Sequence, residues 1–158
     1  MKSNYTVPLS KIIKEFSLET VYAPETIEDV TVCSTEINRP GIQMAGYFKY
    51  FDAQRIQIIG KAEESYLKSL GTEEALNRLK ALFSEHPSAV VFCRNLAMAD
   101  MCVELGREFG VPIFRTEAST SSFSAAFLAA SSSAVFWSSS ASAKAFLCKN
   151  SYAESLSK

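Results

Sequence analysis

At 158 residues the chain has the length of one ordinary domain, which is enough to bury a hydrophobic core. Its hydrophobic fraction of 47% and charged fraction of 21% are those of a globular protein in water. The net charge of -1 gives no electrostatic reason to expect nucleic acid or an anionic membrane as a partner. No apolar run approaches the roughly 20 residues that span a bilayer, and no signal-peptide core follows the N-terminus, so we expect a cytoplasmic protein.

One helix and two strands are predicted near the N-terminus. Residues 7–16 place Leu9, Ile12 and Phe16 at helical spacing, with a proline suited to a first helical turn. Residues 19–22 and 29–33 contain the β-branched side chains that are typical of strands.

The most patterned stretch covers residues 37–60. Its Arg39-Pro40-Gly41 sequence predicts a turn, because proline disfavours a helical conformation at the preceding residue and glycine adopts conformations closed to other residues. A short helix or turn is expected next, and the β-branched run at 55–59 predicts a buried strand. Asp52 and Arg55 lie three residues apart and could pair across one turn.

After residue 60 the pattern alternates between helices and strands. Thr72 is a predicted N-cap, and Thr120 or Ser121 is another. The remaining predicted elements are helices over 63–70, from 72 to before Pro87 and over 98–109, strands over 89–93 and 111–114, and a last helix that contains Phe123, Phe127 and Leu128. This alternation predicts an α/β fold, with a largely parallel sheet, right-handed crossovers and flanking helices.

The composition changes after about residue 128. Of the 24 residues from 119 to 142, 11 are serine, and serine and alanine bury little apolar area. We therefore divide the chain into a domain over 1–128 and a Ser/Ala-rich tail over 129–158. The tail is expected to be a poorly anchored segment or a frayed helix, not a second domain.

The sequence contains none of the common phosphate-binding, nucleotide-binding or hydrolase motifs. The phosphate-binding pattern GxxxxGKS/T is absent, as are GxGxxG and GxSxG. The four cysteines form no CxxC pair and His86 is the single histidine, so a zinc site is not indicated. Cys93 and Cys102 lie in apolar patterns and are predicted to be buried, reduced thiols, whereas His86 is expected to be exposed near the end of a helix.

Two groups of residues near predicted strand ends have alternative interpretations. Arg94, Arg107 and Arg115 could form an anion site, or they could make surface ion pairs. Thr116 and residues 119–122 follow a strand at the edge where open α/β sheets bind ligands, yet helix capping explains the same hydroxyl groups. The patterns alone indicate an α/β domain without a recognisable active site.

Five segments resemble the N-terminal domain of bacterial HPr kinase/phosphorylase. They are residues 7–16 (VPLSKIIKEF), 38–48 (NRPGIQMAGYF), 55–63 (RIQIIGKAE), 110–116 (GVPIFRT) and 119–123 (STSSF). The resemblance covers about residues 5–128 and implies a fold similar to the first domain of the muramyl ligases. The candidate ligand or interface residues in this chain are Arg39, Gly41, Arg55, Thr116 and Ser119.

In that family the domain precedes a P-loop kinase domain. The resemblance implies that the whole enzyme phosphorylates a serine of the phosphocarrier HPr with ATP or pyrophosphate and Mg²⁺, and removes the phosphate by phosphorolysis. It further implies a hexamer that governs carbon catabolite repression. The catalytic His-Gly-Val-Leu-Val-Asp segment and the Gly-Lys-Ser of the P-loop are missing from this sequence. No catalytic, cofactor-binding or metal-binding residue is therefore assigned to this chain.

The expected role is a non-catalytic regulatory or assembly domain, with HPr as the implied partner and a homo-oligomer as a possible state. A small-molecule-sensing α/β module and an active serine kinase/phosphorylase are the two alternatives. The change of composition near residue 128 also suggests a truncated or frameshifted product. If the other reading frames of the gene encoded no kinase-like sequence downstream, the frameshift idea would fail.

Overall fold

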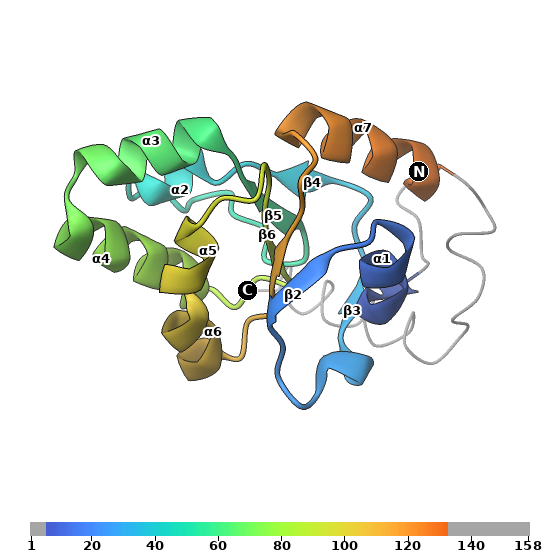
Figure 1. Ribbon diagram of the computed structural model, residues 1–158. Coiled ribbons are helices and arrows are strands. Elements are labelled where there is room, and N and C mark those ends of the chain that lie inside the picture. The colour runs from blue at the N-terminus through green and yellow to red at the C-terminus, as the bar shows by residue number, and fades with distance from the viewer. Residues whose placement is uncertain (1–5, 133–158) are drawn as a thin grey trace.

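A five-stranded sheet lies at the centre of the protein, whose computed structural model describes residues 6–132 (Figure 1). The strand order is β2 (Glu19–Tyr22), β7 (Ile113–Arg115), β6 (Val90–Phe92), β5 (Ile56–Ile59) and β4 (Ile37–Asn38). The four strands β4 to β7 are parallel, and β2 is an antiparallel edge strand. A separate antiparallel pair joins β1 (Val7–Pro8) to β3 (Thr31–Val32). The predicted α/β class is confirmed.

Helices cover both faces of this sheet. In Figure 1, α3, α4, α5 and α6 lie on one side of the strands, and α1 and α7 lie on the other. The helices are α1 (Leu9–Glu15), α2 (Gly41–Met44), α3 (Lys61–Ser69), α4 (Thr72–Phe83), α5 (Met98–Met101), α6 (Val103–Phe109) and α7 (Thr120–Ser131), with a 3₁₀ turn at Ile27–Asp29.

Two hydrophobic cores result, one on each face. The first packs the sheet against α3 to α6 and includes Leu79, Phe83 and Phe92. The second packs the sheet against α1 and α7, where Phe123 and Phe127 contact Phe16 at ring-centroid distances of 5.5 and 5.9 Å. Because β5 and β6 are buried on both faces, their sequences are continuous apolar runs with the single exception of Gln57.

Several elements depart from the sequence prediction. The predicted helix at 7–16 begins only at Leu9, because Val7 and Pro8 pair with β3. The predicted helix at 98–109 is two helices that meet at Cys102, and Met101, in the first of them, is 41% exposed. Strand β4 was not predicted, since two paired residues are too short for a period of two to be visible.

Both predicted N-caps were wrong by one or two residues. Thr72 is the first helical residue of α4, and the preceding Gly71 has a φ of 85° that favours glycine. Ser119, not Thr120 or Ser121, caps α7, with its hydroxyl accepting from the Ser122 amide at 3.1 Å. Within residues 6–132, no helix has the length and apolar character needed to cross a membrane.

Candidate functional site at the carboxyl edge of the sheet

The parallel strands all end at one edge of the sheet, where four connecting segments meet. Arg39 follows β4, Gly60 follows β5, Cys93 and Arg94 follow β6, and Thr116 follows β7. The chain leaves β5 and β6 toward the face covered by α3 and α5, but leaves β7 toward α7 on the opposite face (Figure 1). Such a change of side separates neighbouring loops and creates the usual ligand position of open α/β sheets.

A buried carboxylate organises the end of β5. Glu63 is 6% exposed, and its Oε2 accepts hydrogen bonds from Arg39 Nη2 at 3.0 Å and from the Gly60 amide at 3.0 Å. The Arg39 side chain is 48% exposed. The Glu63 carboxylate therefore accepts a backbone N–H at the start of α3, where negative charge is favourable. It also holds the guanidinium of Arg39 above the end of β5.

Gly60 allows α7 to approach the same point from the other face. A Cβ atom at this buried position would overlap Cγ2 of Thr120 and lie 3.4 Å from Arg39 Nη2 and from Glu63 Oε2. Only glycine leaves space for the three neighbouring side chains. The carboxyl end of β5 is therefore the place where the two helical layers meet.

The loop after β6 has an unusual backbone conformation. Arg94 and Asn95 have φ values of 56° and 51°, in the left-handed region that non-glycine residues seldom adopt. Hydrogen bonds of 2.9 Å from their amides to the carbonyl oxygens of Ala118 and Thr116 hold this conformation. The loops after β6 and β7 are thus fixed to each other, and the side chains of Arg94 and Asn95 are exposed.

Cys93 lies beneath this loop as a buried thiol. Burial raises its pKa to about 11, although the positive charges of Arg39 and Arg94 oppose that effect. Burial raises the pKa of Cys102 to about 12. Both side chains are buried and free of disulfides, which confirms the prediction of reduced core thiols. The raised pKa values leave almost no thiolate at neutral pH, so neither sulfur is prepared to act as a nucleophile.

The candidate residues named from the sequence occupy different places. Arg39, Thr116 and Ser119 lie at the carboxyl edge, where Thr116 Oγ1 accepts from the Ala118 amide at 3.2 Å and Ser119 caps α7. Gly41 is the exposed first residue of α2 and has no positive φ, so it does not use the conformational freedom that glycine offers. Arg55 precedes β5 at the opposite edge, where it pairs with Glu36 and with Asp52 at 3.6 Å.

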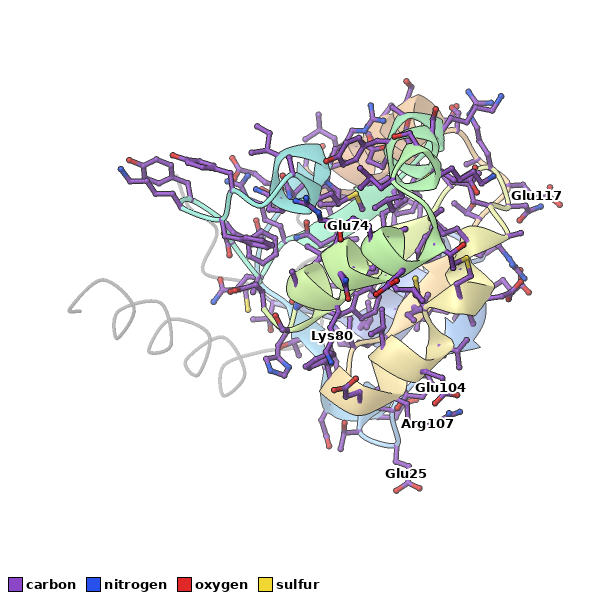
Figure 2. The ribbon with its side chains drawn as sticks, turned by 90° about the vertical axis from the view of Figure 1, so that its left-hand side faces the viewer. Glu25, Glu74, Lys80, Glu104, Arg107 and Glu117 are labelled. Carbon is purple, nitrogen blue, oxygen red and sulfur yellow. The ribbon has the colours of Figure 1, made fainter. Side chains whose placement is uncertain are left out.

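The three arginines that were considered as an anion site have separate surroundings. Arg107 pairs with Glu104 on the outer face of α6, as Figure 2 shows. Arg115 forms an ion pair with Glu19 at 2.9 Å, which joins β7 to β2, and another with Asp100 at 3.3 Å, which joins β7 to α5. Arg94 makes no ion pair with any residue in the range 6–132.

The sequence predicted the surroundings of His86 but missed the role of Glu63. His86 is exposed after α4, as predicted, and its Nδ1 lies 2.9 Å from the Phe109 carbonyl oxygen. Glu63 was missed as a site residue, although its place three positions after Gly60 is a capping signal. Over the described residues, no three His, Cys, Asp or Glu side chains are grouped as metal ligands.

Comparison with known proteins places this fold in a family. A family model described as the N terminus of HPr serine kinase matches residues 7–129, which include every strand and the residues of the carboxyl edge. The HPr kinase/phosphorylase of Lachnoclostridium phytofermentans is 39% identical over 121 residues, covering 77% of this chain and 39% of that protein. The Bacillus mycoides enzyme of the same name is 36% identical over 113 residues, covering 72% and 36%.

A third relative gives the same extent of similarity. The HPr kinase/phosphorylase of one Clostridium perfringens strain is 36% identical over 117 residues, covering 74% of this chain and 38% of the relative. The chain thus spans somewhat over a third of the length of these curated relatives. The match takes in both hydrophobic cores and the Arg39–Glu63 ion pair between them, and the chain belongs to the family of HPr serine kinase N-terminal domains.

Proposed function

We propose that this chain is a non-catalytic domain that serves regulation or assembly in an HPr kinase/phosphorylase. The observation that carries the proposal is the family match over residues 7–129, with relatives named HPr kinase/phosphorylase of which the chain covers 36% to 39%. On this proposal the serine phosphorylation of HPr belongs to the complete enzyme. HPr is the partner of that enzyme, and ATP or pyrophosphate with Mg²⁺ supplies its phosphoryl group.

The state of the backbone at the carboxyl edge supports a non-catalytic role. Phosphoryl transfer depends on a loop whose free amides surround the phosphates, together with a lysine and a metal. Here the amides of Arg94 and Asn95 bond to carbonyl groups of the next loop, and the Gly60 amide bonds to Glu63. Within residues 6–132, the loops after β5 and β6 therefore offer no cradle of free amides for a triphosphate.

The exposed surface of α2 and of the loop that follows it supports a role in assembly. Ile42, Tyr47 and Tyr50 are 64%, 54% and 83% exposed, which is unusual for large apolar side chains that lie close together in sequence. The loop is nevertheless fixed, because Phe48 and Phe51 pack edge to face at 5.8 Å against the first core. An ordered loop that exposes aromatic side chains is typical of a protein–protein contact.

A phosphotransfer assay tests the proposal. The purified chain is incubated with HPr, Mg²⁺ and radiolabelled ATP, with the full-length Clostridium perfringens enzyme as the positive control. We expect labelled HPr only in the control. Mg²⁺-dependent labelling by this chain would show that it is a kinase and would overturn the non-catalytic assignment.

A sedimentation experiment addresses assembly separately. We expect the chain to self-associate in sedimentation velocity, and Tyr50→Ser to weaken that association without changing the unfolding midpoint. A chain that stays monomeric at the highest soluble concentration would remove the support for homo-oligomeric assembly.

A further inference from the structure

The carboxyl edge contains two arginines on either side of the end of β5. Arg39 follows β4 and Arg94 follows β6, and β5 lies between these two strands. Neighbouring strands are about 4.8 Å apart, and the strand register places Arg39 level with Ile58 and Arg94 two residues beyond Phe92, the partner of Ile59. The two backbone positions are therefore on the order of 14 Å apart, a distance that two arginine side chains can close from opposite sides. The amide of Cys93 bonds to the Ile59 carbonyl oxygen at 3.0 Å, which brings the residue before Arg94 beside the end of β5.

The guanidinium of Arg39 lies beside Gly60, at the end of β5. Its Nη2 bonds to the buried Glu63 and lies 3.4 Å from the position that a Cβ on Gly60 would occupy. The side chain remains 48% exposed. A guanidinium carries five N–H donors, so one bond to Glu63 leaves donors that face solvent above the strand end.

Arg94 supplies a positive charge that no carboxylate neutralises within residues 6–132. Its left-handed backbone is fixed by the bond from its amide to Ala118, so the direction in which the side chain leaves the loop is fixed as well. The positive charges of both Arg39 and Arg94 act to lower the pKa of the Cys93 thiol, against the larger effect of burial.

One acidic group near this edge neutralises Arg39, but none is paired with Arg94 within the described residues. Glu63 is paired with Arg39, and Glu64 is paired with Lys68 at 3.3 Å. Figure 2 shows Glu117 extending outward from the loop between β7 and α7. Lys61, the exposed first residue of α3, adds a further positive charge.

We propose that Arg39 and Arg94 form a binding site for one phosphate-type dianion above the carboxyl end of β5. The ligand is inorganic phosphate or a phosphomonoester, held by side-chain donors because the neighbouring amides of Arg94, Asn95 and Gly60 are already bonded. Guanidinium groups suit this task, since their planar fork of donors matches two phosphate oxygens. The site is independent of whether the chain phosphorylates HPr.

A ligand-induced stability measurement tests the site. The thermal midpoint of the complete chain is followed during titration with inorganic phosphate and, separately, with glycerol 3-phosphate, while chloride keeps the ionic strength constant. We expect a saturable rise with half-saturation at about 1–10 mM, a range typical of a few exposed charge-assisted contacts. Tighter binding of either compound identifies the source of the dianion.

The variant Arg94→Asn removes the second guanidinium but keeps a side chain that tolerates the left-handed conformation. It should weaken phosphate binding by about tenfold or more. The control Arg107→Asn removes a surface charge of the same kind on α6 and should bind phosphate as the unmodified chain does. The proposal fails if neither compound gives a saturable rise up to about 50 mM at constant ionic strength, or if Arg94→Asn binds phosphate with unchanged affinity.

Discussion

The ion pair between Arg39 and Glu63 gives the sharpest test of how the carboxyl edge is held together. Replacing Arg39 with glutamine would leave the Glu63 carboxylate, 6% exposed, with the Gly60 amide as its remaining hydrogen-bond donor. Breaking a fully buried pair costs about 3–5 kcal/mol, whereas exposed pairs contribute about 0–1 kcal/mol. Because one partner is buried and the other is half-exposed, we expect Arg39→Gln to lower the free energy of unfolding by about 2 kcal/mol.

A double-mutant cycle assigns this cost to the buried charge. Glu63→Gln removes the charge but keeps an oxygen that can accept from the Gly60 amide. In that background the Arg39→Gln change should cost less than about 0.5 kcal/mol, which leaves a coupling energy of roughly 1.5 kcal/mol. Urea denaturation measures the four proteins, and the matching shift of the thermal midpoint for Arg39→Gln is about 6–10 °C.

The surface pair on α6 provides the control. Arg107 and its partner Glu104 are 59% and 80% exposed, so Arg107→Gln should change stability by less than about 0.5 kcal/mol. The reasoning would be refuted by a coupling energy near zero between Arg39 and Glu63. It would equally be refuted if the two arginine substitutions had the same effect.

Three further changes test the packing on each side of this edge. Gly60→Ala should destabilise the protein by about 2 kcal/mol, because the new methyl group overlaps a methyl group of α7. Gly41 has open space around it, so Gly41→Ala should be neutral or slightly stabilising in urea denaturation. Phe123→Ala should lower the free energy of unfolding by about 3–5 kcal/mol, because this side chain of α7 is buried. Leu128 is 65% exposed, so Leu128→Ala should cost less than about 0.5 kcal/mol, and equal costs would contradict the packing of α7. Burial raises the pKa of Cys93 from its ordinary value of 9.0 to about 11, so the unfolded thiol ionises first and stability should fall between pH 9 and 11. Cys93→Ala should show a shallower fall over that range, and an unchanged slope would exclude this thiol as a cause.

The sequence predicted those parts of the fold that depend on a long or fully apolar pattern. Strands β5 and β6 are buried on both faces, so their apolar runs are visible without knowledge of their neighbours. Strand β2 was predicted at its observed bounds but not as antiparallel to β7, since strand pairing across 96 residues leaves no local pattern. The short strand β4 was missed because only its pairing with β5 defines it.

The candidate site was only partly visible in the sequence for a related reason. Arg39 and Glu63 are 24 residues apart, and nothing in the spacing indicates that they meet. Arg39 and Arg55 lie in the same patterned stretch and were both named as candidates. A strand separates its ends by its own length, however, so Arg55 lies at the amino edge and the residues after Ile59 at the carboxyl edge. Long-range topology, not residue type, decides which charges share a site.

The predicted boundary at residue 128 stays a prediction, and the structure gives it a physical context. Helix α7 continues to Ser131, and the family match ends at residue 129. The helix is held to the domain by Phe123 and Phe127, which stack at 6.2 Å and pack on Phe16. The Ser/Ala-rich tail that the sequence predicts lies, after residue 132, outside the described residues.

The use of backbone donors at the carboxyl edge limits what this domain can bind. A chain of phosphates needs several free amides in succession, because each phosphate presents oxygens along the length of the ligand. The bonds from Arg94 and Asn95 to the loop after β7, and from Gly60 to Glu63, use those donors for the fold itself. Side-chain guanidinium groups remain, and two of them suit a single compact dianion better than a nucleotide. The same hydrogen bonds that make this edge rigid thus separate it from the phosphate-transferring sites of P-loop enzymes.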